Sequence, residues 1–292
     1  MKNIIKSILA AAILLNTTSC LKDDELIGPD APGAITNVVE FGNVSAPISG
    51  VTSPIPVYSL AYDIVPSATL DLPIKVVGAE PATADTKVVI ELNNALVGRY
   101  NDFLNEDPEN DIEYAVLPSD RYAVTTTEVT IKKGERVATI PVQFKPNLFT
   151  FDKDYAIGLT IKSASNGEVS GNFGNIVINV AAKNPYDGTY NYRTSAATSL
   201  VPNANKTVQL VTVGPHRVKL SPGLLGTYSN EVYYNVDPAT NLVTVECPSL
   251  GVQTPQDTRS KWDPATKTLK VYWKQGNGGR TFEETFTYTG SR

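Results

Sequence analysis

Apolar and polar residues alternate at every second position along most of the chain, which predicts strands with one buried and one exposed face. Leu70, Leu72 and Ile74, for example, alternate with Asp71 and Pro73. Because proline cannot donate a hydrogen bond to a neighbouring strand, we expect this strand at a sheet edge. The strands predicted in the first part of the chain cover residues 70–76, 88–92, 129–131, 137–144, 155–161 and 176–180.

One segment has helical spacing instead. Residues 95–104 place four large apolar side chains on one face, and Asn93 or Asn94 is the predicted N-cap. These side chains are Leu96, Tyr100, Phe103 and Leu104. Residues 132–135 predict a hairpin turn, and residues 165–167 predict a second turn. Short strands, turns and one small helix together predict an all-β first domain, an immunoglobulin-like β-sandwich.

The second part of the chain contains an internal repeat. Residues 237–245 and 263–271 both begin with Asp-Pro-Ala-Thr and continue into a strand-like pattern. Asp followed by Pro favours a type I turn, so each copy predicts an antiparallel hairpin. Successive hairpins predict a small antiparallel meander barrel, lipocalin-like in shape. The strands predicted here are residues 231–236, 242–246, 259–262, 269–274 and 281–289.

A domain boundary is predicted at residues 181–185, where a strand ends and a proline follows. The formal charge also changes sign there. Residues 20–183 carry 12 basic and 22 acidic side chains, whereas residues 184–292 carry 11 and 8. We therefore expect the sandwich over residues 35–183 and the barrel over residues 184–292.

Residues 1–19 have the pattern of a signal peptide. Lys2 and Lys6 precede a short apolar run, which is far below the roughly 20 residues that cross a bilayer. Cys20 follows small polar residues, and this predicts a bacterial lipoprotein with acyl chains on Cys20. Thr17 stands where such signals usually have leucine, so an ordinary secretory signal with an incidental cysteine remains the alternative.

Composition excludes several classes of protein. The formal net charge of −5 does not fit a nucleic-acid binder, which would show a basic stripe. Cys20 and Cys247 are the two cysteines, so Cys247 has no disulfide partner once Cys20 is acylated, and we expect it to be a buried strand residue. His216 is the one histidine. We therefore expect no histidine or cysteine metal site, and no cofactor is predicted.

Four charged residues follow Cys20 almost at once. They are Lys22, Asp23, Asp24 and Glu25. This cluster resembles the surface-export signal of Bacteroidetes lipoproteins, and the resemblance implies an outer-membrane protein that faces the cell exterior. The alternative is that the charges only keep a tether, residues 20–34, in water.

Four segments of the first domain carry a further pattern. They are residues 114–118 (Tyr-Ala-Val-Leu-Pro), Tyr122, residues 129–135 (ending in Gly-Glu) and residues 154–159. Together they resemble the N-terminal domain of unknown function common in Bacteroidetes surface lipoproteins, over residues 35–183. The opening of the second domain, residues 186–190, resembles small barrels attached to the same family. The resemblance implies an accessory lipoprotein of a starch-utilisation-like glycan system, beside an outer-membrane importer, with no catalytic residues to carry over.

Candidate catalytic groups are few. A Ser-His-Asp triad would need a serine such as Ser221 beside His216, and the sequence has no Gly-x-Ser-x-Gly motif. We therefore expect His216 to be a turn residue. The acidic residues 106–113 lack the spacing of a calcium loop and predict a solvated loop. Glu284 shares the inward face of its strand with Phe282, so we expect it to be partly buried near the barrel mouth. The alternatives are that it pairs with Arg280 or a lysine, or that it lines a cavity.

Aromatic side chains predict the ligand site, because sugars stack their C–H faces on aromatic rings while polar groups bind their hydroxyls. Alternation places Trp273 in the barrel core and predicts that Trp262 and Tyr272 are exposed. The predicted ligand-binding residues are Trp262, Tyr272, Tyr228 and Tyr234. The alternative is that these aromatic rings only pack the domain.

Three functions remain. The first is a non-catalytic surface lipoprotein that captures glycan for an outer-membrane importer. The second is an adhesin or fimbria-like structural subunit, whose assembly would need cleavage after an early arginine. The first arginine here is Arg99, well inside the first domain. The third is a glycosidase built on two carboxyl groups.

Lipid attachment at Cys20 gives the first testable prediction. Metabolic labelling with a palmitate analogue will mark the protein, because Cys20 is the predicted acylated residue. Protease added to whole cells will cleave it, because the acidic tether holds it outside. An unlabelled protein would contradict the lipid anchor, and a protein that resists the added protease would contradict the exterior location.

Overall fold

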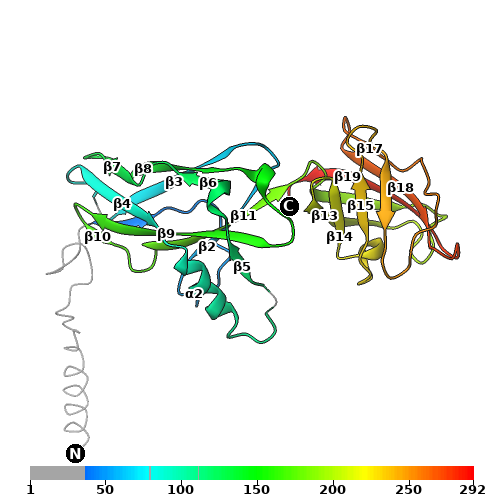
Figure 1. Ribbon diagram of the computed structural model, residues 1–292, viewed down its shortest axis with the longest axis horizontal. Helices are drawn as coiled ribbons and strands as arrows, with labels where there is room; N and C mark the ends of the chain where they lie inside the picture. The colour runs from blue at the N-terminus through cyan, green and yellow to red at the C-terminus, as the bar shows by residue number, and fades with distance from the viewer. Residues whose placement is uncertain (1–36, 79, 111) are drawn as a thin grey trace, which may run out of the picture.

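The computed structural model describes residues 37–78, 80–110 and 112–292. Strands dominate these residues and build two bodies that lie end to end (Figure 1). Residues 37–183 form two facing sheets, the sandwich, and residues 184–292 form a barrel. The all-β prediction is therefore confirmed. Within the described residues, no helix has the length and apolar character that crossing a membrane requires.

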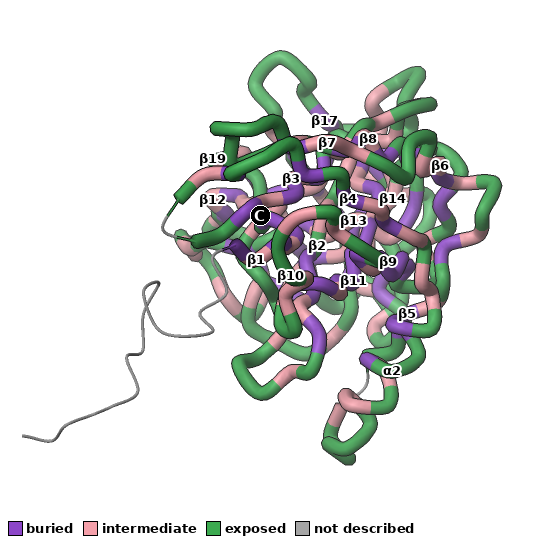
Figure 2. Tube along the Cα trace, turned by 90° about the vertical axis from the view of Figure 1, so that its left-hand side faces the viewer, coloured by how far each residue is buried: buried purple, intermediate pink, exposed green. Residues whose placement is uncertain are grey.

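The sandwich contains a five-stranded and a six-stranded sheet. The first has the order β10 (Glu168–Val169), β1 (Val38–Phe41), β3 (Ala68–Val77), β8 (Val137–Phe144) and β6 (Tyr122–Val124). The second has the order β2 (Val57–Asp63), β11 (Asn175–Lys183), β9 (Asp154–Ala164), β4 (Thr86–Leu92) and β7 (Glu128–Ile131), with β5 (Tyr114–Val116) paired to β9. Two 3-10 turns are η1 (Ser119–Arg121) and η2 (Pro146–Leu148). The buried stretches of both sheets, purple in Figure 2, form the core between them.

The strand that contains Pro73 is not at an edge, so that prediction is wrong. β3 lies between β1 and β8. β1, however, ends where Phe41 pairs with Ile74, and the carbonyl of Pro73 accepts the N–H of Gly42 at 2.7 Å just beyond that end. In an antiparallel strand the N–H and C=O of one residue point to the same side. A backbone N–H at position 73 would therefore point toward β1 at a position where β1 has already ended.

The turn at residues 132–135 is present, but it does not make a hairpin. Glu135 donates its N–H to the carbonyl of Lys132 at 2.9 Å. The strand before the turn, β7, pairs with β4, whereas the strand after it, β8, pairs with β3 and β6. The chain therefore crosses from one sheet to the other here. A hairpin and a crossover both need a tight turn between two apolar strands, so the pattern alone did not separate them.

The helix α2 (Ala95–Leu104) covers the outer face of the six-stranded sheet, as Figure 1 shows. Leu96 and Tyr100 pack against Ala156 of β9 and Val177 of β11. The neighbouring residues on those strands point into the sandwich core instead. This sheet is therefore buried on both faces, which explains why β9 carries an unbroken buried run from residue 155 to residue 159.

The start of α2 is fixed to the sheet through Gly158. Asn94 is the N-cap residue, but its side chain does not bond to the helix. Its Oδ1 accepts the N–H of Gly158 at 3.1 Å, and Asn93 donates its N–H to the carbonyl of Gly158 at 2.8 Å. A Cβ on residue 158 would collide with the carbonyl of Asn93 and lie 3.0 Å from Leu96. Glycine therefore permits the close approach of helix and strand.

Residues 184–292 form an eight-stranded antiparallel barrel whose neighbours in space are mostly neighbours in sequence. The order is β16 (Val243–Glu246), β15 (Tyr233–Val236), β14 (Arg217–Ser221), β13 (Asn205–Gly214), β12 (Gly188–Thr194), β19 (Thr281–Gly290), β18 (Thr268–Lys274) and β17 (Lys261–Asp263). A 3-10 turn, η3 (Leu224–Gly226), follows β14. The two outermost strands meet through one bridge, Leu242 with Lys261, so the barrel is nearly closed.

Beyond that bridge, side chains replace the missing strand partners. The amide side chain of Gln256 accepts the N–H of Val245 at 2.7 Å and donates to its carbonyl at 3.0 Å. The hydroxyl of Ser260 does the same for Tyr272, at 2.9 Å and 3.1 Å. Since an unpaired backbone group costs free energy when it is buried, these side chains complete the barrel where its strands stop.

A buried asparagine joins the two bodies. Asn184 directly follows β11 and is 2% exposed. Its N–H donates to Oγ1 of Thr212, and its Nδ2 donates to the carbonyls of Gly214 and Arg217 at 2.9 Å and 3.0 Å. Its Oδ1 accepts the N–H of Tyr186. The chain is therefore bound to the barrel as soon as it leaves the sandwich.

Replacing Gln256 by alanine should destabilise the barrel by about 1–3 kcal/mol, because the buried backbone of Val245 loses both partners. Both tryptophans, Trp262 and Trp273, lie in the barrel, so urea unfolding followed by tryptophan fluorescence reports on this part of the chain. Gln253→Ala is the matched control, since Gln253 lies in the same loop with an exposed side chain. Equal unfolding midpoints for both variants would contradict the role given to Gln256.

Candidate functional site

The barrel interior is filled by aromatic side chains around one buried carboxyl group. Glu284 is 1% exposed. Tyr192 donates its hydroxyl to Oε1 of Glu284 at 2.7 Å, and Tyr234 donates to Oε2 at 3.0 Å. The indole N–H of Trp273 also donates to Oε2, at 2.9 Å. Glu284 thus points inward as predicted, but its partners are three neutral donors and not a cation.

Burial is the main influence on the ionisation of this cluster. Desolvation raises the pKa of Glu284 above its ordinary value, and the three hydrogen bonds only partly oppose this. The pKa values of Tyr192 and Tyr234 are also raised, by burial and by the nearby charge of Glu284. We interpret the cluster as part of the folded core, since every polar side chain in it is sealed from water.

Two predicted ligand residues belong to this core. Tyr234 is fully buried. Trp262 is 6% exposed and packs edge-on against Tyr186 at 5.2 Å between ring centroids, so the prediction that Trp262 is exposed is wrong. The reason is the strand register. Trp262 pairs with Leu269, and paired residues project from the same face, so the inward direction of Leu269 carries Trp262 with it.

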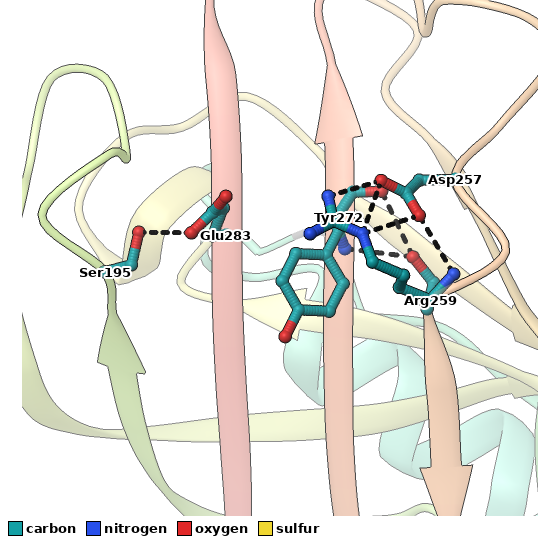
Figure 3. A network of polar contacts seen from close by, with 6 residues as sticks. Ser195, Asp257, Arg259, Tyr272 and Glu283 are labelled. Atoms are coloured by element: carbon teal, nitrogen blue, oxygen red, sulfur yellow. Dashed lines mark hydrogen bonds and ion pairs between the residues drawn. The ribbon is translucent and has the colours of Figure 1, made fainter.

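Tyr272, a third predicted ligand residue, lies on the outside of the barrel as predicted. It sits on the outer face of β18, directly opposite Glu283 of β19. The guanidinium carbon of Arg259 lies 4.3 Å from the centre of the Tyr272 ring, a cation–π contact. Asp257 holds this arginine through a 2.6 Å contact from Nη2 to Oδ2 (Figure 3). The hydrogen bond from Arg259 in turn lowers the pKa of Asp257.

Hollows flank Tyr272 on two sides. One, of about 250 Å³, lies between the loop of residues 253–259 and the strands β18 and β19. The other, of about 220 Å³, includes Arg193 and Ser195. Tyr272 and Glu283 line both. We call this surface the Tyr272 site, and its members are Arg193, Ser195, Asp257, Arg259, Tyr272 and Glu283.

The Tyr272 site is held in one arrangement by its own hydrogen bonds. Ser195 donates to Oε2 of Glu283 at 2.6 Å, as Figure 3 shows. The hydroxyl of Thr198 binds both the N–H and the carbonyl of Glu283, at 3.0 Å and 2.9 Å. Ser260 fixes the backbone of Tyr272 in the same way. The ring and the carboxylate are thus in place before a ligand arrives, which lowers the cost of binding.

A larger cleft, of about 1050 Å³, lies between the sandwich and the barrel. Lys183 and Asn179 line it from the sandwich, and Trp262 and Tyr288 line it from the barrel. The ammonium group of Lys267 sits 4.6 Å from the centre of the Tyr288 ring, an arrangement like that of Arg259 at Tyr272. The walls are mostly polar, and Trp262 contributes little exposed surface. The Tyr272 site is therefore the better candidate for a ligand that stacks on an aromatic ring.

The other sequence predictions have mixed outcomes. Tyr228 is 38% exposed but lines neither hollow of the Tyr272 site. His216 lies exposed in a turn, as predicted. Cys247 is buried as predicted, but it directly follows β16 and is not part of a strand. Across the described residues, no three His, Cys, Asp or Glu side chains gather as a metal site would require. The predicted lipidation and export residues lie outside the described residues: Cys20, Lys22, Asp23, Asp24 and Glu25.

Five members of the Tyr272 site were not predicted from the sequence. They are Arg193, Ser195, Asp257, Arg259 and Glu283. Ser195 and Glu283 are 88 positions apart, and they meet because β12 and β19 pair to close the barrel. The one signal that the sequence offers for the Tyr272 site is the strict alternation of β18, which places Lys270, Tyr272 and Lys274 on one face.

Two family matches divide the chain in a similar way. Residues 188–290 match a domain of unknown function, DUF7015. Residues 51–168 match a family described as a "-like, N-terminal domain". No curated protein matches the chain.

Solved structures from Bacteroides share the fold. One from Bacteroides ovatus, of unknown function, has a TM-score of 0.55 at 12% identity, with 88% of this chain and 95% of that chain covered. Another from the same species, also of unknown function, has a TM-score of 0.50 at 15% identity, covering 86% and 93%. An auxiliary nutrient binding protein from Bacteroides thetaiotaomicron has a TM-score of 0.47 at 11% identity, covering 80% and 89%. The two structures with TM-scores of 0.55 and 0.50 show a common fold, and at their low identities they say nothing about the ligand of this chain.

The buried Glu284 predicts a pH dependence of barrel stability. Because the pKa of Glu284 is raised in the folded protein, the folded state holds this proton to higher pH than the unfolded chain does. The stability that the proton provides is complete below the ordinary glutamate pKa of 4.5 and is lost as pH rises through the raised pKa. Urea midpoints from tryptophan fluorescence should therefore fall across this window.

Glu284→Gln should remove that fall, since glutamine does not titrate and the hydroxyl of Tyr192 can turn to accept the amide hydrogen. Glu284→Ala should instead cost about 3 kcal/mol or more at every pH, because three buried donors lose their acceptor. The same pH slope in the wild type and in Glu284→Gln would show that another group causes it.

Proposed function

We propose that this protein is a non-catalytic, lipid-anchored surface protein that binds glycan at the Tyr272 site. The observation that carries the proposal is the fixed, outward-facing Tyr272 ring between two hollows, with Glu283 and Arg259 at its edges. An aromatic face offers a surface for the C–H groups of a sugar, and the carboxylate and guanidinium groups accept and donate hydrogen bonds to its hydroxyls.

The carboxyl groups of the site support binding over hydrolysis. A glycosidase needs one carboxylic acid whose pKa is raised, so that it can protonate the leaving oxygen. The pKa of Asp257, beside the ring, is lowered by Arg259. The pKa of Glu284 is raised, but this side chain is sealed in the barrel core.

The location is proposed from the sequence. Cys20 would carry the acyl chains, and Asp23, Asp24 and Glu25 would direct the protein to the outer face of the outer membrane. Such a protein would hold a glycan near an outer-membrane importer. The N-terminal family match and the Bacteroides structures with the same fold are in keeping with a Bacteroidetes accessory lipoprotein.

Tyr272→Ala should weaken glycan binding in a glycan array or in gel retardation by about tenfold, because the stacking surface is lost while the fold is kept. The matched control is Tyr233→Ala. Tyr233 also carries an arginine over its ring, with the guanidinium carbon of Arg217 at 4.0 Å, but it lies on β15, away from the hollows.

An intact protein that retains no glycan would overturn the proposal. Equal losses for Tyr272→Ala and Tyr233→Ala would place the site elsewhere. Filaments in electron micrographs would favour a structural subunit, and turnover of a polysaccharide that one carboxylate-to-amide change abolishes would establish an enzyme.

A further inference from the structure

The strand register aligns basic side chains on the outer face of the barrel. Lys261 pairs with Lys270, Lys270 pairs with Thr285, and Thr285 pairs with Arg193. Paired residues project from the same face, and neighbouring strands lie about 4.8 Å apart, so these four positions form one row of roughly 14 Å across four strands. Lys261, Lys270 and Arg193 are all exposed, and we call them the basic row.

The basic row runs beside the Tyr272 site. Tyr272 and Glu283 form the same-face pair two residues along from Lys270 and Thr285, a spacing of about 7 Å. Arg193 belongs to both the row and the hollow next to Tyr272. A ligand chain that lies over Tyr272 would therefore meet these cations.

The charges of the basic row are not balanced by ion pairs. Like charges that face each other directly across two strands, as Lys261 and Lys270 do, destabilise a sheet. The ion pairs in the described part of the barrel are Arg217–Glu246, Lys219–Glu231, Arg259–Asp257 and Arg292–Asp187, and none of them includes the row. The repulsion would be relieved by an anion from outside.

The carboxylates close to the row form no ion pair with it, although the hydrogen bond from Thr266 and, to a lesser extent, the charge of Lys270 lower the pKa of Asp263. Glu283 accepts the hydroxyl of Ser195. Asp263 accepts the hydroxyl of Thr266 at 2.8 Å and a backbone N–H at 3.0 Å. Asp257 holds Arg259. The row thus stands out as basic on a chain whose formal net charge is −5.

We infer that the ligand of the Tyr272 site is an acidic glycan, whose carboxylate or sulfate groups bind the basic row while a sugar ring contacts Tyr272. This inference rests on the proposed function and narrows its ligand class. A neutral glycan would use Tyr272 and leave the row unpaired. An acidic glycan uses both, and its binding weakens as salt is added, because exposed charges are screened.

Affinity gel electrophoresis of the purified full chain tests this with four polymers. Polygalacturonate carries carboxylates, dextran sulfate carries sulfates, dextran is neutral, and poly-glutamate is an anion without sugar. We expect retardation by at least one acidic glycan, reduced by added NaCl, and none by dextran or poly-glutamate. The combined variant Lys261→Gln, Lys270→Gln, Arg193→Gln should raise the Kd about tenfold, since three charge contacts are lost.

The matched control removes three exposed charges of the sandwich that form no ion pair among the described residues, as Arg99→Gln, Lys133→Gln and Lys153→Gln, and should leave the Kd unchanged. Retardation by dextran alone would overturn the acidic ligand and leave the proposed glycan binding intact. Equal retardation by poly-glutamate, or equal losses in both combined variants, would show binding by charge alone and overturn the inference. Retardation by none of the four, with no glycan bound on an array, would overturn the inference and the proposed function together.

Discussion

The backbone hydrogen bonds at the seams of the barrel are the constraint on which the rest depends. Strands that stop short leave N–H and C=O groups that must be paired. Gln256, Ser260 and Thr198 provide these partners for Val245, Tyr272 and Glu283. Because these side chains pair the backbone groups in place of a continuous strand, the loop of residues 253–259 can lie between β16 and β18 and leave a hollow above β18. The residues that close the barrel are thus the ones that position its outer site.

The filled interior decides where a ligand can bind. Some eight-stranded barrels hold their ligand inside. Here Tyr192, Tyr234 and Trp273 converge on Glu284, and the stacked rings of Trp273 and Phe282, 4.1 Å apart, fill the space beside it. The interior therefore stabilises the fold, and the proposed glycan site lies on the outer faces of β12, β18 and β19.

Much of the fold could be predicted from the sequence because the alternation of apolar and polar residues shows which face of each strand is buried. It identified strands such as β3, β9 and β19, the helix and the Asp-Pro hairpins of the barrel, but β2, β12, β13 and β14 were not predicted. Alternation does not show which strands pair with one another or in which register, and the wrong predictions depend on that pairing. The position of Pro73 within its sheet and the crossover at residues 132–135 depend on which strands pair, and the burial of Trp262 depends on register.

The same distinction holds for the site. Tyr272 could be placed outside because Lys270 and Lys274 share its face. Its neighbours come from β12, from β19 and from the loop of residues 253–259, and they meet only once the barrel closes. A single sequence holds no local signal for a contact such as that between Ser195 and Glu283.

The joint at Asn184 has a mechanical consequence. Its hydrogen bonds bind the residue that directly follows β11 to the barrel, so no free linker separates the two bodies, and we expect them to turn together. The first described strand, β1, begins at the end of the sandwich far from the barrel (Figure 1). For a protein anchored at its N-terminus, the sandwich would then be a rigid spacer of constant length. The Tyr272 site would stay at a constant distance from the start of β1.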